Sequence, residues 1–132
     1  MTIAILYLVT AATFLILDAL MLNLVMSPLF RSHLGEALLD SPRYGPVLVF
    51  YLFYVAGLLW FVSLPALRAE APVQALIGGA VLGALAYGTY EFTNYATLRD
   101  WSMQMVVTDV LWGTALTGVS AWVGVMAARA WG

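Results

Sequence analysis

YGTYEFTNYATLRDW, residues 87–101, is the stretch at which a strongly apolar chain changes character. Four polar or charged side chains gather there at the end of a long hydrophobic segment: Glu91, Asn94, Arg99 and Asp100. Ionisable side chains are costly inside a membrane and usually serve a function there. We therefore interpret the stretch as the end of one membrane-spanning helix and the turn into the next, and as part of a candidate site.

The composition around that stretch is typical of an integral membrane protein. Of the 132 residues, 64% are hydrophobic and 9% are charged, and the mean hydropathy is +0.95, outside the usual range of soluble domains. A helix needs ~20 apolar residues to cross ~30 Å of hydrocarbon, so four spans and their connections use the whole length. Long unbroken apolar runs argue against an alternating β-barrel. The sequence predicts an all-α, four-helix transmembrane bundle that forms a single domain over residues 1–132.

Several kinds of cofactor chemistry lack their usual ligands in this sequence. It has no Cys, no Lys and a single His, His33. Iron–sulfur clusters and disulfides need Cys, a retinal Schiff base needs Lys, and membrane haem sites need paired His. We expect none of these cofactors. The net charge of -2 gives no reason to expect a nucleic-acid partner.

The first span should cover Ile3 to about Met26, with Asp18 and Asn23 in its second half. These two side chains point about 140° apart on a helix, so only one of them can face the same neighbour squarely. Ser27-Pro28 then predicts the start of a short amphipathic helix, Leu29 to Leu39, that lies in the plane of the membrane interface.

The remaining spans follow from prolines and turn residues. Asp40-Ser41-Pro42 should break the amphipathic helix. The second span should run from Val47 to Leu64 and end at the proline that follows, and the third should begin at Pro72. Asp100 is predicted to cap the fourth, roughly Trp101 to Ala128.

The three carboxyl groups within the spans should lie at a similar depth, in one leaflet. At ~1.5 Å per residue, counted from the side of the first and third loops, Asp18 lies ~12 Å deep and both Glu91 and Asp109 ~10 Å. Three carboxylates without a cation at their level cannot all stay ionised in a low dielectric, so the layer must share protons, hold a cation or recruit Arg99.

This layer defines the candidate site. A purely structural role, as hydrogen-bonded glue between helices, is the alternative, but such bonds average ~0.6 kcal/mol against ~2.5 kcal/mol or more for inserting one central Asp. A metal ion, if any, would be held by the three acids. The residues predicted to bind a ligand, proton or cation are Asp18, Asn23, Tyr51, Tyr87, Glu91, Asn94, Arg99, Asp109 and Trp112.

Small residues recur every four positions in the third span, at Ala75, Gly79 and Gly83. This spacing lets helix backbones approach closely in a membrane. It is compatible with tight packing inside the bundle and with a homodimer. The arginines divide three to two between the two faces, which favours termini on the non-cytoplasmic side; they are Arg31, Arg43 and Arg99 against Arg68 and Arg129.

The motif at residues 87–101, together with VVTDVLWG at 106–113, resembles a bacterial family of small predicted four-span membrane proteins of unknown function. The resemblance covers nearly the whole chain and implies a location in the inner membrane. Because relatives are often encoded beside enzymes that modify membrane fatty acids, it also implies a lipid-related role. The motif positions that it marks are Tyr87, Glu91, Asn94, Thr97, Arg99, Asp100, Asp109 and Trp112.

Four functions remain open from the sequence. The first is a pocket that binds a proton, a cation or a polar ligand such as a lipid headgroup. The others are a small proton-coupled transporter, an enzyme acting on lipid, and an accessory subunit of a larger membrane complex. Enzymatic activity is undecided, since no nucleophile with an adjacent base can be recognised.

Overall fold

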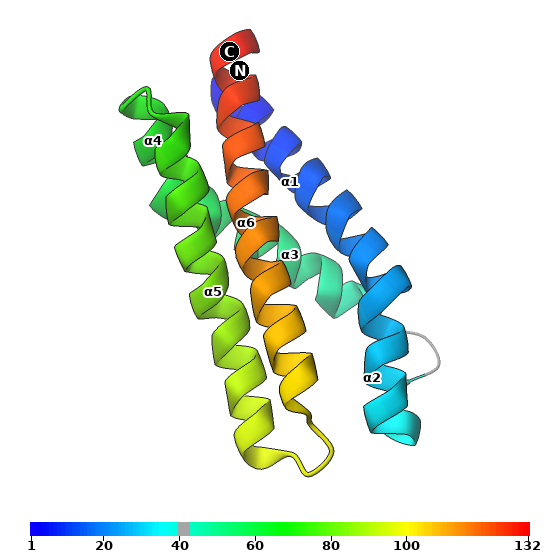
Figure 1. Ribbon diagram of the computed structural model, residues 1–132. Coiled ribbons are helices and arrows are strands. Elements are labelled where there is room, and N and C mark those ends of the chain that lie inside the picture. Colours follow the sequence, from blue (N-terminus) through cyan, green and yellow to red (C-terminus); the bar gives the residue numbers. More distant parts are fainter. Residues whose placement is uncertain (40–42) are drawn as a thin grey trace.

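The computed structural model describes residues 1–39 and 43–132, in which four helical segments are long and apolar enough to cross a membrane. The segments run alternately up and down, so that both termini lie at the same end (Figure 1). There the Thr2 hydroxyl donates a hydrogen bond to the Gly132 carbonyl at 3.0 Å. The predicted all-α membrane fold is confirmed. The four segments are Thr2–Ala37, Tyr44–Arg68, Pro72–Thr97 and Met103–Trp131.

The first two segments contain π-helical turns. The first consists of α1 (Thr2–Met21), the π-helical η1 (Leu22–Met26), α2 (Ser27–Leu34) and a short 3-10 turn, η2 (Gly35–Ala37). The second consists of α3 (Tyr44–Leu58), the π-helical η3 (Leu59–Ser63) and α4 (Leu64–Arg68). The predicted break at Asp40-Ser41-Pro42 lies outside the described residues.

Two predicted helix boundaries are wrong for the same physical reason. Pro28 and Pro65 each stand two residues after a π-helical turn, and the helix continues through both. A proline inside a helix lacks an N–H and its ring collides with the carbonyl four residues earlier. That carbonyl lies inside the wider turn in both cases, which accommodates the ring. Pro65 therefore does not end the second span, and Ser27 makes no capping hydrogen bond with its side chain.

The amphipathic segment exists, but it extends α1 instead of turning into the interface plane (Figure 1). Its apolar side packs against the beginning of α6, in a cluster built on buried Trp101, Met105 and Val106. Its opposite side is exposed. The amphipathic pattern thus reflects packing within the protein. The α2 side chains in this cluster are Leu29, Phe30 and Leu34.

The last two segments, α5 (Pro72–Thr97) and α6 (Met103–Trp131), form the closest helix pair and lie side by side in Figure 1. A methyl group on Gly79 would stand 2.8 Å from the Thr117 carbonyl oxygen, and one on Gly83 would collide with the Gly113 carbonyl. The small-residue face is therefore filled by α6 of the same chain. Packing within the bundle is confirmed. A homodimer through Ala75, Gly79 and Gly83 would require α6 to move away from this face of α5.

The start of α6 differs from the prediction by two residues. Ser102 is the N-cap, and its hydroxyl accepts a hydrogen bond from the Met105 backbone N–H at 3.2 Å. Asp100 is exposed in the preceding loop. This register turns the Trp101 indole inward, where only 7% of it is exposed.

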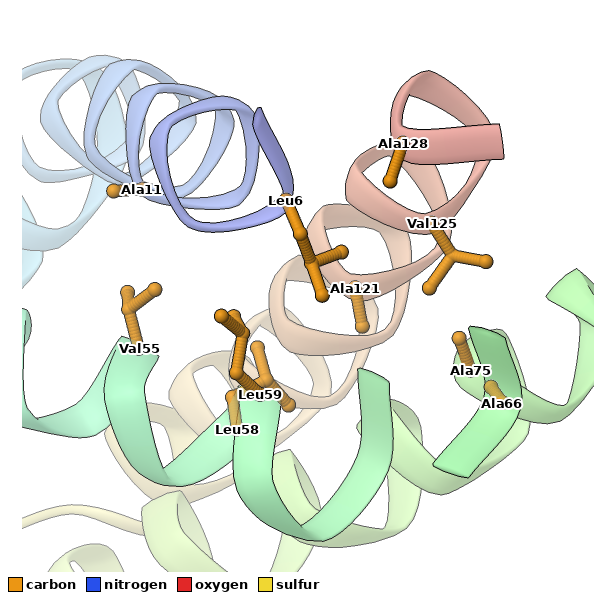
Figure 2. Close-up of a cluster of buried hydrophobic side chains, with 10 residues drawn as sticks. All are labelled: Leu6, Ala11, Val55, Leu58, Leu59, Ala66, Ala75, Ala121, Val125 and Ala128. Carbon is orange, nitrogen blue, oxygen red and sulfur yellow. The ribbon is translucent and has the colours of Figure 1, made fainter. Parts of the chain in front are cut away.

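Three of the four segments form a layer, and the remaining one crosses it. α6 is central, with α5 on one side and α1 on the other, while α3 crosses behind them diagonally (Figure 1). At the end that carries the termini, η3 and α4 complete a core with α1, α5 and α6. Figure 2 shows its side chains converging, among them Leu6, Leu58 and Val125. Because α3 runs obliquely, this close packing is restricted to one end of the bundle.

Candidate functional site

A pocket of about 710 Å³ lies at the other end of the bundle, between α3 and the layer formed by α1, α6 and α5. Its lining is mostly apolar and aromatic, with two carboxyl groups and several tyrosines. This volume falls within the range of small-molecule sites, roughly 300–1,000 Å³. The lining residues are Asp18, Leu22, Met26, Phe30, Pro46, Val47, Phe50, Tyr51, Tyr54, Ala86, Tyr87, Thr89, Tyr90 and Asp109.

Asp18 enters the pocket from α1 and is 5% exposed. The indole N–H of Trp112, on α6, donates to its Oδ1 at 3.3 Å. The Tyr51 hydroxyl of α3 faces the same carboxyl group. Three helices therefore meet at this acid.

Asp109 enters from α6, one turn before Trp112, and is 9% exposed. Behind it, outside the pocket lining, the carboxyl group of Glu91 approaches within hydrogen-bonding reach. Glu91 Oε2 receives no N–H or O–H from the described residues. A hydrogen bond between the two carboxyl groups therefore needs a proton on one of them.

Glu91 itself is fully buried and is held from the loop side by Trp101. The Trp101 indole N–H donates to Glu91 Oε1 at 2.8 Å. The ring packs against Phe30 of α2, with centroids 5.4 Å apart, and against Tyr90 of α5 at 5.7 Å. Trp101 thus closes the loop end of the carboxyl pair and links it to two pocket-lining aromatics.

Half of the aromatic residues that line the pocket come from α3. Phe14 of α1, which is fully buried, packs with its ring centroid 5.4 Å from those of both Tyr51 and Tyr54. Tyr54 is anchored by a 3.0 Å hydrogen bond to the Thr117 hydroxyl of α6. The Tyr87 hydroxyl is enclosed, makes no short hydrogen bond to the described residues, and faces the Tyr51 hydroxyl. Tyr51 therefore faces both the Asp18 carboxyl group and the Tyr87 hydroxyl.

Six of the nine predicted site residues come together here. Asp18, Tyr51, Tyr87 and Asp109 line the pocket, Trp112 binds Asp18, and Glu91 contacts Asp109. Asn23 and Arg99 are exposed, so neither reaches the acids. Asn94 is half-buried and lies beside Tyr90. Asp18 is buried whereas Asn23, five residues later, is exposed.

The three acids do not form a preformed metal site. Within residues 1–39 and 43–132, no group of three His, Cys, Asp or Glu side chains is arranged to hold a metal ion. Asp18 is held by an indole N–H and Glu91 by another. Because indole N–H groups face Asp18 and Glu91, hydrogen bonding is the chemistry that these carboxyl groups favour.

The sequence did not single out Trp101, Phe50 or Tyr90 as site residues. Trp101 ends the motif at residues 87–101, and its position was interpreted as the start of a helix; the cap at Ser102 is what turns it inward. Phe50 and Tyr90 are both more than half exposed, as ordinary lipid-facing aromatic residues would be. Only the oblique path of α3 shows that they flank a pocket.

Comparison with known families gives one match. The family described as predicted membrane protein (DUF2177) has a model that matches residues 3–126. The chain belongs to this family. The match includes the four spans nearly to their ends and every pocket-lining residue of this DUF2177 protein. No curated protein and no solved structure matches the chain.

Proposed function

We propose that this DUF2177 protein binds a small polar group, either cationic or rich in hydrogen-bond donors, between Asp18 and Asp109 inside the bundle. The observation that carries the proposal is that these two buried acids line one pocket. Carboxylate oxygens accept hydrogen bonds only, so a partner must supply N–H or O–H donors.

The position of Asp109 supports a ligand over a purely structural role. Asp109 lines the pocket, and the carboxyl group that faces it from behind, Glu91, can donate a hydrogen bond only if it carries a proton. Carboxyl oxygens that face the pocket need a hydrogen-bond donor from its occupant, because a buried polar atom without a partner costs free energy. A donor-rich ligand would supply it.

The test is direct binding by the purified protein. Native mass spectrometry in detergent should detect a complex with a long-chain amino alcohol, whose head carries a cation and a hydroxyl. The Asp18→Asn/Asp109→Asn double variant should bind at least ten-fold less, because both charges facing the head are removed. Glu70→Gln, an exposed loop position, is the control and should bind normally. Equal binding by all three proteins would refute the proposal.

A second function is favoured by the contact between Glu91 and Asp109. A proton shared by this pair lies next to the pocket, so binding of a cationic head at Asp109 would release it. This is the element that a proton-coupled transporter requires. Proton release on ligand addition, measured in weakly buffered solution and lost in Glu91→Gln, would support it. Binding without proton release would leave only the first function.

The location proposed for the protein is the bacterial inner membrane, with both termini on the non-cytoplasmic side. Its support is the three-to-two arginine distribution between the two faces, and a lipid-related role would fit that setting. Reporter fusions should give an active periplasmic reporter at the C-terminus and an inactive one between η2 and α3. The reverse pattern would invert the orientation.

A further inference from the structure

The pocket has a side entrance, and the entrance faces the lipid. Among its lining residues, those that are substantially exposed come chiefly from the first half of α3 and from the second half of α5. Phe50 is 59% exposed, Val47 39% and Tyr90 52%. The carboxyl groups, in contrast, lie at the closed end.

The path of α3 explains why this entrance exists. In the described part of the chain, α5 is packed by η3 and α4, the continuation of α3, while α3 itself packs mainly on α1. The first half of α3 therefore diverges from α5 (Figure 1). Phe50 and Tyr90 lie six and seven residues inside the nearer ends of the membrane-spanning segments Tyr44–Arg68 and Pro72–Thr97, about 9–10 Å deep at ~1.5 Å per residue, so we take their exposed faces to meet acyl chains. The pocket therefore opens sideways, between α3 and α5, toward the surrounding lipid.

The chemistry of the pocket changes along its length. The entrance is built from apolar and aromatic groups, and the Thr89 hydroxyl there is already bonded to the Leu85 carbonyl at 2.6 Å. The polar groups gather around Asp18 and Asp109, both buried, with the Tyr51 hydroxyl facing Asp18. A ligand that satisfies both ends has a hydrogen-bond-donating head and an apolar tail.

From this arrangement we infer that the ligand is a single-chain amphiphile with a cationic or donor-rich head, which enters from the bilayer between α3 and α5. Its head lies between Asp18 and Asp109, and its chain leaves through the entrance beside Phe50 and Tyr90. The inference rests on the proposed function and adds the class of ligand and its route. It also explains an apolar wall that a small soluble ion would not need.

The test uses a long-chain amino alcohol that carries a photoreactive diazirine halfway along its chain, with the protein reconstituted in nanodiscs. We expect cross-links, assigned to single residues by fragmentation, to concentrate at Phe50 in α3 and at Tyr90 in α5. Phe53 and Phe61, on the outer faces of the same segment, are 77% and 72% exposed and report non-specific lipid contact. Labelling at the entrance should exceed labelling at these sites at least five-fold.

A matched pair of variants separates entry from general lipid contact. Ala86→Phe places a ring in the pocket from α5 and should reduce entrance labelling at least ten-fold. Ala115→Phe adds the same ring to an exposed position of α6 and should leave the labelling unchanged. A thermal unfolding curve for each variant checks that the bundle is intact, and Ala86→Leu serves as a smaller plug if the Phe variant does not fold.

A second probe distinguishes failure of this inference from failure of the proposed function. Ethanolamine has the same kind of head but no chain, and its binding is measured by NMR line broadening. If ethanolamine binds in an Asp18- and Asp109-dependent manner while the photoprobe labels all lipid-facing sites equally, the side entrance is refuted and the head site stands. If ethanolamine does not bind and the photoprobe labels without preference, both are refuted.

Discussion

At the level of single residues, the site depends on indole N–H groups that hold buried acids. Trp112 donates to Asp18, and Trp101 donates to Glu91. The sequence predicted that Asp18, Glu91 and Asp109 would face inward, because acids in long apolar helices have few other places to go. It included Trp112 in the site but not Trp101, because the contact of Trp101 with Glu91 depends on how the loop before α6 folds.

The bond from Trp101 to Glu91 should contribute measurably to stability. Trp101→Phe keeps an aromatic ring against Phe30 but leaves a fully buried carboxyl oxygen without its donor. We expect a loss of about 1–3 kcal/mol in the free energy of unfolding. The measurement is reversible unfolding in mixed micelles.

A double-mutant cycle isolates the pair. In a Glu91→Leu background, which has no carboxyl group to leave unpaired, Trp101→Phe should cost clearly less than in the wild type. Strictly additive costs would mean that the hydrogen bond contributes nothing and that Trp101 acts only by packing.

At the level of helices, the role of the small residues could be predicted from the sequence, but the role of the prolines could not. The spacing of Ala75, Gly79 and Gly83 correctly predicted a close helix contact, because only small residues allow backbones to meet. The prolines misled the prediction in two ways: Ser27-Pro28 is typical of a helix start, and Pro65 was expected to end the second span because a proline inside a helix usually breaks it. Pro28 and Pro65 are instead absorbed by π-helical turns, which depend on tertiary packing and have no local sequence signal.

The contact between α5 and α6 should tolerate no added methyl group. In Gly79→Ala the new carbon would stand 2.8 Å from the Thr117 carbonyl oxygen and 2.9 Å from the Gly118 Cα. We expect destabilisation of about 1–3 kcal/mol from overpacking, again measured by unfolding in micelles.

Gly57→Ala on α3 is the matched control, because nothing lies within 4 Å of its added carbon. It should be neutral or stabilising by about 0.5–1 kcal/mol, as expected for replacing Gly in a helix. Destabilisation of both variants by the same amount would indicate that glycine is needed for something other than the α5–α6 contact.

At the level of the whole molecule, the bilayer replaces water as the surroundings of most exposed side chains. The composition alone predicted this, and with it the four spans. The oblique path of α3 was not predictable, because Phe50 and Phe53 both look like generic residues of a hydrophobic helix. Only the crossing places Phe50 at a pocket entrance while Phe53 faces outward.

The lipid-facing position of Phe53 gives a test of membrane placement. Phe53 is 77% exposed near the middle of the second segment. Phe53→Arg should make insertion of that segment about 2.5–3.5 kcal/mol less favourable, whereas Phe53→Leu should insert normally. Glycosylation mapping in microsomes measures the inserted fraction. Equal insertion of both variants would show that this face of α3 is not in contact with lipid.

The central claim is that Asp18 and Asp109 form the head-binding end of a pocket that holds an amphiphile. The most direct measurement is an experimental density map of the protein extracted from its own membrane without added ligand. The account predicts elongated non-protein density in the pocket, with one end between the two carboxyl groups and the other passing between α3 and α5. A pocket closed by protein side chains, or lipid density confined to the outer surface, would contradict it.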